Sequence, residues 1–257
     1  GLNIKRSPLC GRNFEYFSED PYLAGKMAAA YVRGIQKNGI AACPKHFAVN
    51  SQELRRMASD SIVDERTLRE IYLTGFEMVV KEAHPKTIMS AYNLINGTYA
   101  NENAHLLQDI LRKDWGFEGA VVTDWGGSND HALGVKNGST LEMPCPGDDS
   151  IRELVKAVET GKITEADVDA RLEELLELVF TTKAAVDAAP GKFDADAHHA
   201  LARRAAAQSI VLLKNENSLL PLAKGEKVAV IGDFAQTPRY QGAGSSAVNS
   251  IKVDSFL

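Results

Sequence analysis

The sequence contains little cysteine, and the cysteines that it has are scattered. Cys10, Cys43 and Cys145 are too few and too far apart for a disulfide framework, and no CxxC pair suggests a zinc site. We therefore expect a reducing compartment, with the cytoplasm favoured. Long apolar runs are also missing, because no stretch approaches the roughly 20 residues that a membrane-spanning helix needs. A membrane partner is therefore not expected.

Charge of one sign is not concentrated anywhere in the sequence. Lys and Arg number 29 against 34 for Asp and Glu, which gives a formal net charge of −5, and there is no basic block. A nucleic-acid partner, which is bound by neutralising its phosphates, is therefore not expected. The hydrophobic fraction of 44% and the charged fraction of 25% are typical of a globular protein. They exclude a disordered chain, a collagen-like fibre and a coiled coil.

The two ends of the sequence suggest an internal portion of a longer polypeptide. The chain begins at Gly1 without a methionine, and its first residues already read as part of a strand. The last residues, up to Leu257, carry no stop signature. The lack of a visible targeting segment is therefore uninformative. A homo-oligomer is compatible with the sequence.

Predicted strands alternate with predicted helices along the first two thirds of the chain. Strands are expected at 40–43, 87–91 and 120–123, with a weaker one at 140–143. Amphipathic helices are expected between and after them, at 22–37, 68–83, 104–113, 151–159 and 164–180. The strands are apolar throughout rather than alternating in polarity. This pattern predicts an α/β fold with a parallel sheet that is covered on both faces.

Three of these strands are followed by unusual polar or aromatic pairs: Lys45 and His46 (after Pro44), Tyr92 and Asn93, and Asp124 and Trp125. In a β/α barrel the carboxyl ends of all strands meet at one mouth, where the chemistry takes place. We therefore expect these side chains to converge although they are distant in sequence. The alternative, that they only cap the following helices, explains one such strand better than it explains three.

A change in composition divides the chain. We assign 1–181 to part of a (β/α) barrel of the TIM type that carries the catalytic groups. The segment 182–198 is rich in alanine, glycine and acidic residues and is expected to be a linker. Residues 199–257 then begin a second α/β unit, with expected strands at 209–213 and 227–231.

Asp124 is the main candidate for catalysis. A carboxylate at the end of an apolar strand is costly to bury unless cations or hydrogen-bond donors hold it. Arg12, Lys45, His46 and Arg56 are candidate cations, and their field would keep Asp124 ionised, as a nucleophile must be. The competing interpretation, that Asp124 only caps a helix, remains open on these grounds.

Two other segments could bind a ligand. Lys45 and His46 open a stretch, 45–53, that is dense in groups able to hydrogen-bond hydroxyls, which favours a polyhydroxylated ligand. The glycine-serine loop at 242–246 resembles a phosphate-binding loop but lacks its lysine, so a loop that covers a neighbouring pocket is an equal alternative. The histidines show no metal-ligand spacing, and no metal site is expected.

Long segments of the sequence resemble the β-glucosidases of glycoside hydrolase family 3. They include GRNFEYFSEDP (11–21), PKHFAVNSQELRRM (44–57), GAVVTDWGG (119–127) and RYQGAGSSAVN (239–249), and they occur in the family's order along essentially the whole chain. The resemblance implies a β/α barrel followed by an α/β sandwich, with the active site between them. It implies hydrolysis of a terminal β-linked sugar with retention of configuration, no cofactor, and a small β-glycoside or oligosaccharide as the partner.

The resemblance also implies roles for single residues. Asp124 matches the family's nucleophile, and Lys45 and His46 match the pair that binds the terminal sugar's hydroxyls. Five further residues match positions around the same sugar: Arg12, Arg56 and Tyr92 line the subsite, Trp125 forms a wall, and Ser245 or Ser246 faces it from the sandwich domain.

The departures from the family pattern matter as much. Lys45-His46 continues through Ala48 rather than into the Pro-Gly-His-Gly of the N-acetylglucosaminidases, which disfavours that subgroup. The family's acid/base glutamate is expected beyond Leu257, so no glutamate of this chain is assigned to that role. Three alternatives remain: a sugar-binding module without the acid/base, another β-glycosidase such as a β-xylosidase, and a barrel lyase or aldolase with Lys45 as a Schiff base.

Overall fold

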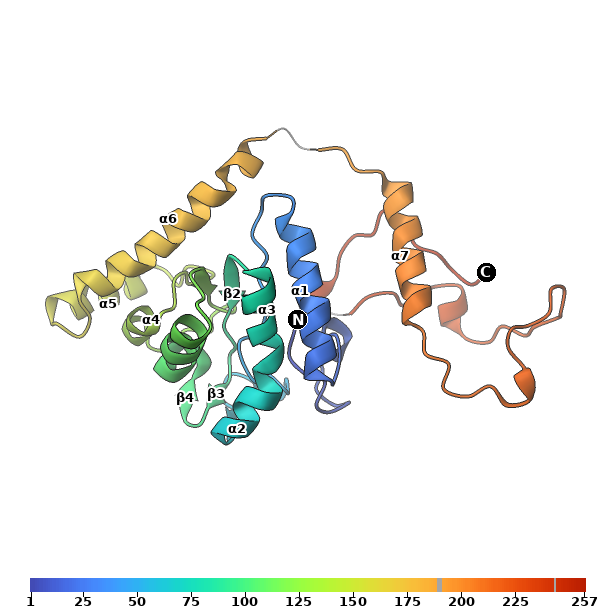
Figure 1. The fold of residues 1–257 in the computed structure, drawn as a ribbon, viewed down its shortest axis with the longest axis horizontal. Coiled ribbons are helices and arrows are strands. Elements are labelled where there is room, and N and C mark those ends of the chain that lie inside the picture. Colours follow the sequence, from blue (N-terminus) through green and yellow to red (C-terminus); the bar gives the residue numbers. More distant parts are fainter. Residues whose placement is uncertain (189–190, 243) are drawn as a thin grey trace. The chain divides into compact units, whose positions relative to one another are not determined.

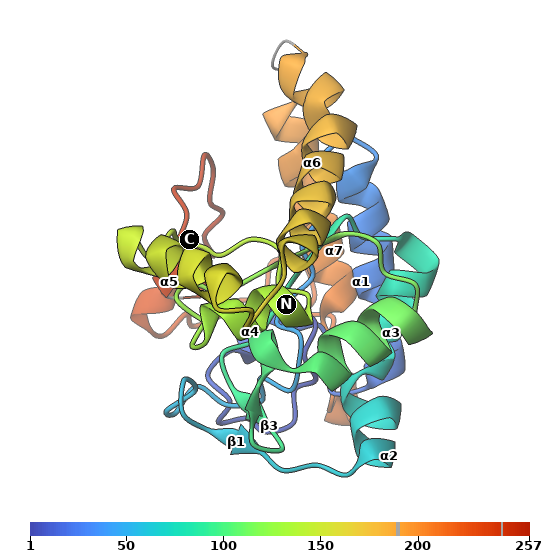
Figure 2. The ribbon, with the colours of Figure 1, turned by 90° about the vertical axis from the view of Figure 1, so that its left-hand side faces the viewer.

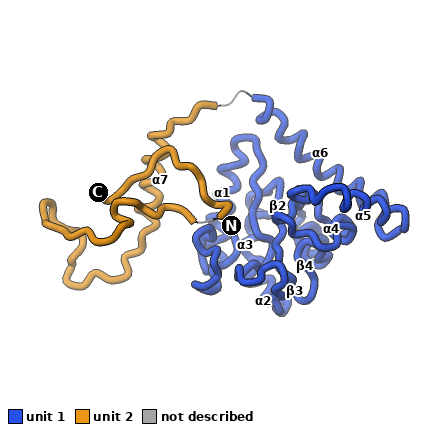
Figure 3. The backbone as a smooth tube through the Cα atoms, turned by 180° about the vertical axis from the view of Figure 1, so that it is seen from behind, with its two compact units in different colours: residues 1–188 blue, residues 189–257 orange. Residues whose placement is uncertain are grey.

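The computed structural model describes residues 1–188, 191–242 and 244–257. The chain forms two compact units, residues 1–188 and 189–257 (Figure 3). The first unit is an α/β fold that contains a small central sheet surrounded by helices (Figure 1). Among the described residues, no helix is both long and apolar enough to cross a membrane.

The central sheet is parallel, and its neighbours follow the order of the chain. Strand β2 (Thr87–Met89) pairs in parallel with β5 (Ala120–Val122). Phe47 forms a parallel bridge with Ser90, just after β2, and Leu141 forms one with the end of β5. Apolar segments that are buried on both faces therefore pair as expected from their composition. The predicted strand at 40–43 is not assigned as a strand, because the pairing begins closer to Phe47.

The extended segment at Leu2 and Asn3 lies on the other side of the segment that carries His46. The Leu2 amide donates to the Lys45 carbonyl at 2.7 Å. The Asn3 side chain donates to the His46 carbonyl and accepts from the His46 amide, both at 2.8 Å. Five consecutive segments of the chain are thus neighbours in space, and polar residues follow three of them.

Helix α1 (Pro21–Gln36) packs against α3 (Thr74–Ala83) on one side of the sheet (Figure 1). The carboxylate of Asp20 caps α1 by accepting from the Tyr22 amide at 2.8 Å. The two helices approach closely because glycines face each other, and a Cβ built at Gly25 would lie 2.7 Å from the Met78 sulfur and 3.2 Å from the Gly75 Cα.

The predicted helices form with shifted ends, and two of them are π-helical. The remaining elements of the first unit are η1 (Asn13–Glu15), α2 (Glu65–Thr67), the π-helices η2 (Leu68–Tyr72) and η4 (His105–Asp114), η3 (Ala100–Glu102), α4 (His131–Asn137), α5 (Asp148–Glu159) and α6 (Glu165–Asp187). A second small sheet has β3 (Leu94–Ile95) between β1 (Asp60–Ser61), which is parallel to it, and β4 (Thr98–Tyr99), which is antiparallel (Figure 2).

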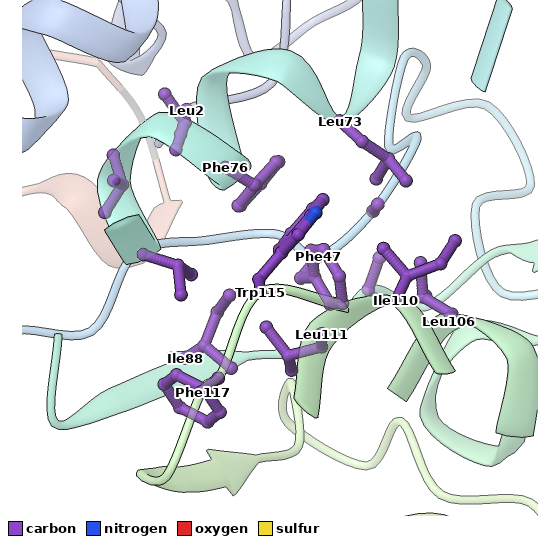
Figure 4. Close-up of a cluster of buried hydrophobic side chains, with 14 of the residues drawn as sticks. Leu2, Phe47, Leu73, Phe76, Ile88, Leu106, Ile110, Leu111, Trp115 and Phe117 are labelled. Carbon is purple, nitrogen blue, oxygen red and sulfur yellow. The ribbon is translucent and has the colours of Figure 1, made fainter. Parts of the chain in front are cut away.

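The core of the first unit lies between the central sheet and its helices. Phe47 packs edge-on against Phe76 and Trp115, with ring centroids 5.2 and 5.8 Å apart (Figure 4). Ile88 and Leu111 are fully buried in the same cluster. Because Phe47 directly follows His46, its burial fixes the backbone that presents His46.

The second unit contains α7 (Ala195–Ser209) and the short 3₁₀ helices η5 (Glu216–Ser218), η6 (Asp233–Ala235) and η7 (Gly244–Ser246). The expected strands at 209–213 and 227–231 are not observed as strands among the described residues. A strand needs a neighbour for its amides and carbonyls, and these two segments do not pair with each other. Helices α6 and α7 extend into the predicted linker from both sides, and its residues Ala189 and Pro190 lie outside the described part of the chain.

Candidate active site

Asp124 lies just beyond the carboxyl end of β5, with 13% of its side chain exposed. Its Oδ1 accepts a hydrogen bond from the Trp125 amide at 2.8 Å. Its Oδ2 is buried and has no hydrogen-bond partner among the described residues. The hydroxyl of Thr123, the residue before it, bonds to the backbone of Met143 and holds this end of the strand in place. Asp124 therefore has one carboxylate oxygen held by a backbone hydrogen bond and one buried oxygen without a hydrogen-bond partner among the described residues.

His46 lies against the free oxygen of Asp124. Its Nε2 is 3.5 Å from Asp124 Oδ2 and 3.2 Å from the Arg12 guanidinium. Burial lowers the pKa of His46 to about 2, and the positive charges of Arg12 and Lys45 lower it further in the same direction. His46 is therefore neutral in this site and is not one of the cations that the sequence led us to expect beside Asp124.

Arg12 and Lys45 share the carboxylate of Glu15. Lys45 Nζ is 3.2 Å from Glu15 Oε2, and the Arg12 guanidinium contacts the other oxygen. Burial would raise the pKa of Glu15, but the hydrogen bond and charge of Arg12 and the charge of Lys45 hold it below its usual value. Glu15 is thus an ionised carboxylate that orients the side chains of Arg12 and Lys45.

Glu53 joins Arg12 to a second arginine. Its Oε1 is 3.4 Å from Arg12, and its Oε2 is 2.7 Å from Arg56. The Arg56 guanidinium lies over the Tyr92 ring, 4.4 Å from its centroid, a cation–π contact. The Tyr92 hydroxyl donates to the Trp125 carbonyl at 2.7 Å, which links this group back to the segment that holds Asp124.

Tyr92 and Trp125 form the aromatic part of the site. Burial raises the pKa of Tyr92 to about 12, and the nearby negative charge of Asp124 acts in the same direction, so the phenol remains protonated. Trp125 is 54% exposed and can present an indole face to a ligand. Gly127 allows this close packing, because a Cβ there would lie 3.1 Å from the Asp124 carbonyl and 3.4 Å from the Tyr92 ring.

The structure thus brings together the sequence-predicted residues of the first unit: Arg12, Lys45, His46, Arg56, Tyr92, Asp124 and Trp125. Ser245 and Ser246 belong to η7 in the second unit, and Ala243 of the same loop lies outside the described residues, so the proximity of this loop to the sugar stays a prediction.

Four residues of the site were missed by sequence reasoning: Asn3, Glu15, Tyr16 and Glu53. Asn3 binds the backbone of His46 on both sides, and the Tyr16 hydroxyl is 3.2 Å from His46 Nδ1. A signal for the two glutamates existed, since each lies three positions from an arginine with which it pairs. No such spacing marks Asn3 or Tyr16.

Within the described residues, no group of three or more His, Cys, Asp or Glu side chains is placed to hold a metal ion. A buried carboxylate oxygen without a hydrogen-bond donor, next to the neutral ring of His46, can act as a nucleophile or a base. Around it, arginine, lysine and tyrosine side chains offer hydrogen bonds suited to a ligand with many hydroxyl groups.

Comparison with known families places this chain in a known class of proteins. The profile of the glycosyl hydrolase family 3 N-terminal domain matches residues 2–178, and that of the family's C-terminal domain matches residues 210–257. The thermostable beta-glucosidase B of Acetivibrio thermocellus is 50% identical over 99% of this chain, and an exo-alpha-(1->6)-L-arabinopyranosidase of Bifidobacterium breve is 48% identical over 100% of it. The chain spans about a third of these relatives, 34% and 35% of their lengths.

Solved structures of beta-glucosidases are also similar to this chain. The crystal structure of the GH3 beta-glucosidase of Bifidobacterium adolescentis superimposes with a TM-score of 0.94 at 46% identity, covering 100% of this chain and 37% of that one. Beta-glucosidase 3B of Thermotoga neapolitana in complex with glucose gives a TM-score of 0.91 at 41% identity, covering 97% and 36%.

Proposed function

Because this chain belongs to glycosyl hydrolase family 3, we propose that it carries the sugar-binding and nucleophilic half of an exo-acting retaining β-glycosidase, with β-glucosidase as the first expectation. Its substrate is a small β-glycoside or oligosaccharide, and the reaction needs no cofactor. The single observation that carries the proposal is the buried Oδ2 of Asp124, which lacks a hydrogen-bond partner among the described residues and adjoins His46, whose ring in turn contacts Arg12.

The proposed architecture is a (β/α) barrel of the TIM type followed by an α/β sandwich. Its support is the chain-order arrangement of five neighbouring segments, from Leu2 to Leu141, with parallel pairing around β2 and β5. Barrels are built from consecutive parallel strands, and their active sites lie at the carboxyl ends. In this proposal 1–181 is part of the barrel, 182–198 the linker and 199–257 the start of the sandwich.

In the proposed mechanism, Asp124 Oδ2 attacks the anomeric carbon and the bond to the leaving oxygen breaks. That oxygen takes a proton from a general acid, and a covalent glycosyl-enzyme forms. Water then attacks the same carbon and gives a proton to the residue that acted as the acid. The bond between the sugar and Asp124 breaks, which restores the carboxylate, and the configuration is retained. The amide of Trp125 holds Oδ1 and thereby aims Oδ2 at the sugar. The negative charge of Asp124 also stabilises the positive charge that develops on the ring.

The general acid must keep a proton at neutral pH, about 5 Å from the nucleophile. Glu15 is unsuitable for this role because Arg12 and Lys45 hold its pKa below its usual value. No glutamate of this chain is assigned as the acid.

The terminal sugar is bound, in this proposal, by the residues around Asp124. Arg12, Lys45 and Arg56 donate to its hydroxyls, and the neutral ring of His46 lines the subsite beside them. Tyr92 lines the same subsite and Trp125 provides an apolar wall. In the complete site Ser245 or Ser246 faces the same sugar. These contacts become stronger as the ring flattens towards the transition state.

A second specificity deserves testing because of the 48% identical arabinopyranosidase. An α-L-arabinopyranoside has the ring configuration of a β-D-galactopyranoside without the hydroxymethyl group, so the same nucleophile could serve both. A β-xylosidase would differ from a β-glucosidase in that same group. Comparing the labelling of Asp124 by activated arabinosyl, xylosyl and glucosyl substrates would rank the three sugars.

Mass spectrometry of an activated substrate tests the proposal. A 2-deoxy-2-fluoro-β-glucoside with a good leaving group needs little acid assistance, so the chain should acquire a glycosyl adduct on the peptide that contains Asp124. The Asp124→Asn variant is the control and should acquire none. An unactivated disaccharide distinguishes a chain that has its own general acid from a module that lacks one. Only the former would hydrolyse it, whereas the latter would leave it intact. An adduct on any other residue, or an equal adduct in the Asn variant, would overturn the proposed nucleophile.

A further inference from the structure

The ring of His46 has three polar neighbours that cannot all be satisfied at once. Its Nδ1 is 3.2 Å from the Tyr16 hydroxyl. Its Nε2 faces the Arg12 guanidinium at 3.2 Å and Asp124 Oδ2 at 3.5 Å. A guanidinium can only donate hydrogen bonds and a carboxylate can only accept them. Nε2 can therefore serve one of these two neighbours, and the position of the ring proton decides which.

The geometry favours Arg12. The Arg12 contact is shorter and has the geometry of a hydrogen bond, whereas the oxygen of Asp124 is left without any hydrogen-bond partner among the described residues. Nε2 is then an acceptor, and a neutral imidazole with an accepting Nε2 carries its proton on Nδ1. The burial that lowers the pKa of His46 to about 2 excludes the doubly protonated ring at neutral pH.

The Tyr16 hydroxyl oxygen is placed to accept a hydrogen bond from the His46 Nδ1–H. Its hydroxyl lies 3.4 Å from the Asn50 carbonyl, which can only accept, so the phenol donates there. The Asn50 side-chain amide donates to the same hydroxyl at 3.3 Å. Burial raises the pKa of Tyr16 well above its usual range, so the phenol stays protonated. The phenol oxygen still has room to accept one bond from His46.

We propose that Tyr16 is a positioning residue that fixes His46 as the tautomer with the proton on Nδ1, which leaves Asp124 Oδ2 without a donor. Donation runs from His46 Nδ1 to Tyr16 and from Tyr16 to the Asn50 carbonyl. The opposite tautomer would place an N–H on Oδ2 and occupy the lone pair that attacks the sugar. This consequence rests on the proposed function, whereas the tautomer itself does not.

Nitrogen NMR of the ¹⁵N-labelled chain measures the tautomer directly and without substrate. The sequence has 6 histidines, so the signals of His46 are assigned by their loss in a His46→Gln variant. The expected result at neutral pH is a protonated Nδ1 and an unprotonated Nε2. A spectrum with the proton on Nε2 would overturn the proposal, whatever the activity of the protein.

Two variants identify what fixes the tautomer. Tyr16→Phe removes the acceptor, so the share of the Nε2-protonated ring should rise, whereas Tyr22→Phe, at an exposed tyrosine on α1, should leave the spectrum unchanged. Asp124→Asn should keep the proton on Nδ1, because Arg12 and Tyr16 remain. A change of tautomer in Asp124→Asn, or none in a folded Tyr16→Phe, would contradict the proposed role. If Tyr16→Phe does not fold, the wild-type and Asp124→Asn spectra still decide which tautomer His46 adopts, and a proton on Nε2 in either would overturn the proposal.

The labelling rate then links the tautomer to reactivity. In Tyr16→Phe we expect labelling of Asp124 by the activated 2-fluoro glucoside to slow about five- to tenfold, the size of one hydrogen bond, while the affinity for glucose changes little. A purely structural defect would weaken both. Equal labelling rates combined with the expected change of tautomer would refute the link to reactivity and leave the tautomer assignment in place.

Discussion

Glu53 holds two arginines of the proposed sugar site with one carboxylate, and Glu53→Gln should separate them. A charge-assisted hydrogen bond contributes about 1.5–3 kcal/mol when it is well formed. The side chains of Arg12, Glu53 and Arg56 are 14%, 27% and 32% exposed, which weakens their interaction by solvent screening. The amide oxygen of glutamine can also retain one arginine. We therefore expect glucose binding to weaken by about 1–2 kcal/mol, or about 5–30-fold in Kd.

Isothermal titration calorimetry with glucose measures this change. Glu82→Gln is the matched control, because Glu82 forms an ion pair of ordinary length, 2.7 Å to Lys26, on the outer surface of α3. The control should bind glucose as the unmodified chain does. If Glu53→Gln binds glucose within twofold of the unmodified chain, or if both variants lose affinity equally, the bridging role of Glu53 is refuted.

Three other perturbations test separate parts of the structure. Lys45→Ala should raise KM or Kd for the terminal sugar about tenfold, because a donor held by Glu15 is lost; unchanged sugar affinity would contradict this. Because burial lowers the pKa of His46 from 6.5 to about 2, the ring is protonated between these pH values in the unfolded state but not in the folded state. The free energy of unfolding therefore decreases as the pH falls below 6.5. Its slope is up to about 1.4 kcal/mol per pH unit, and His46→Gln should flatten the acid side of a melting-temperature profile; an unchanged profile would refute this. Gly25→Ala should destabilise the protein by about 1–3 kcal/mol in urea unfolding, whereas Gly34→Ala on the same helix, with open space at its Cβ, should be neutral or stabilising; similar effects would contradict the proposed close contact of α1 and α3.

The sequence alone allowed the convergence of the site to be predicted, because that inference needs only local patterns. Apolar runs mark the strands, and the polar residues after them must meet if the strands are parallel neighbours. Lys45, Tyr92 and Asp124 were placed together on this basis, and contacts through Glu15, Arg56 and Trp125 connect them in the structure. The helices could also be predicted from local sequence patterns, although their observed ends differ from the predicted ones.

The long-range partners of these residues could not be predicted, because they depend on tertiary structure. The spacing of Glu53 and Arg56 indicates that pair, but nothing in the sequence indicates the contact of Glu53 with Arg12 or that of Tyr16 with His46. The charge state of His46 was misjudged for a similar reason. Its neighbours suggested a cation, whereas its side chain is only 1% exposed and burial keeps the ring neutral.

The expected strands at 209–213 and 227–231 show that β-propensity alone does not predict a strand. Both segments are rich in β-branched residues, yet a strand forms only where a neighbouring chain segment supplies its hydrogen bonds. The same rule applies to the first predicted strand, because the hydrogen bonds to the neighbouring strand are made by Pro44 and Phe47, and 40–43 is not a strand.

The central claim is that Asp124 Oδ2 is the nucleophile, and peptide mapping after reaction with the activated 2-fluoro glucoside tests it most directly. The account predicts one glycosyl adduct per chain, attached to Asp124, that turns over slowly and is missing in Asp124→Asn. A chain that binds glucose and yet forms no adduct, or forms it on a different side chain, would contradict the account.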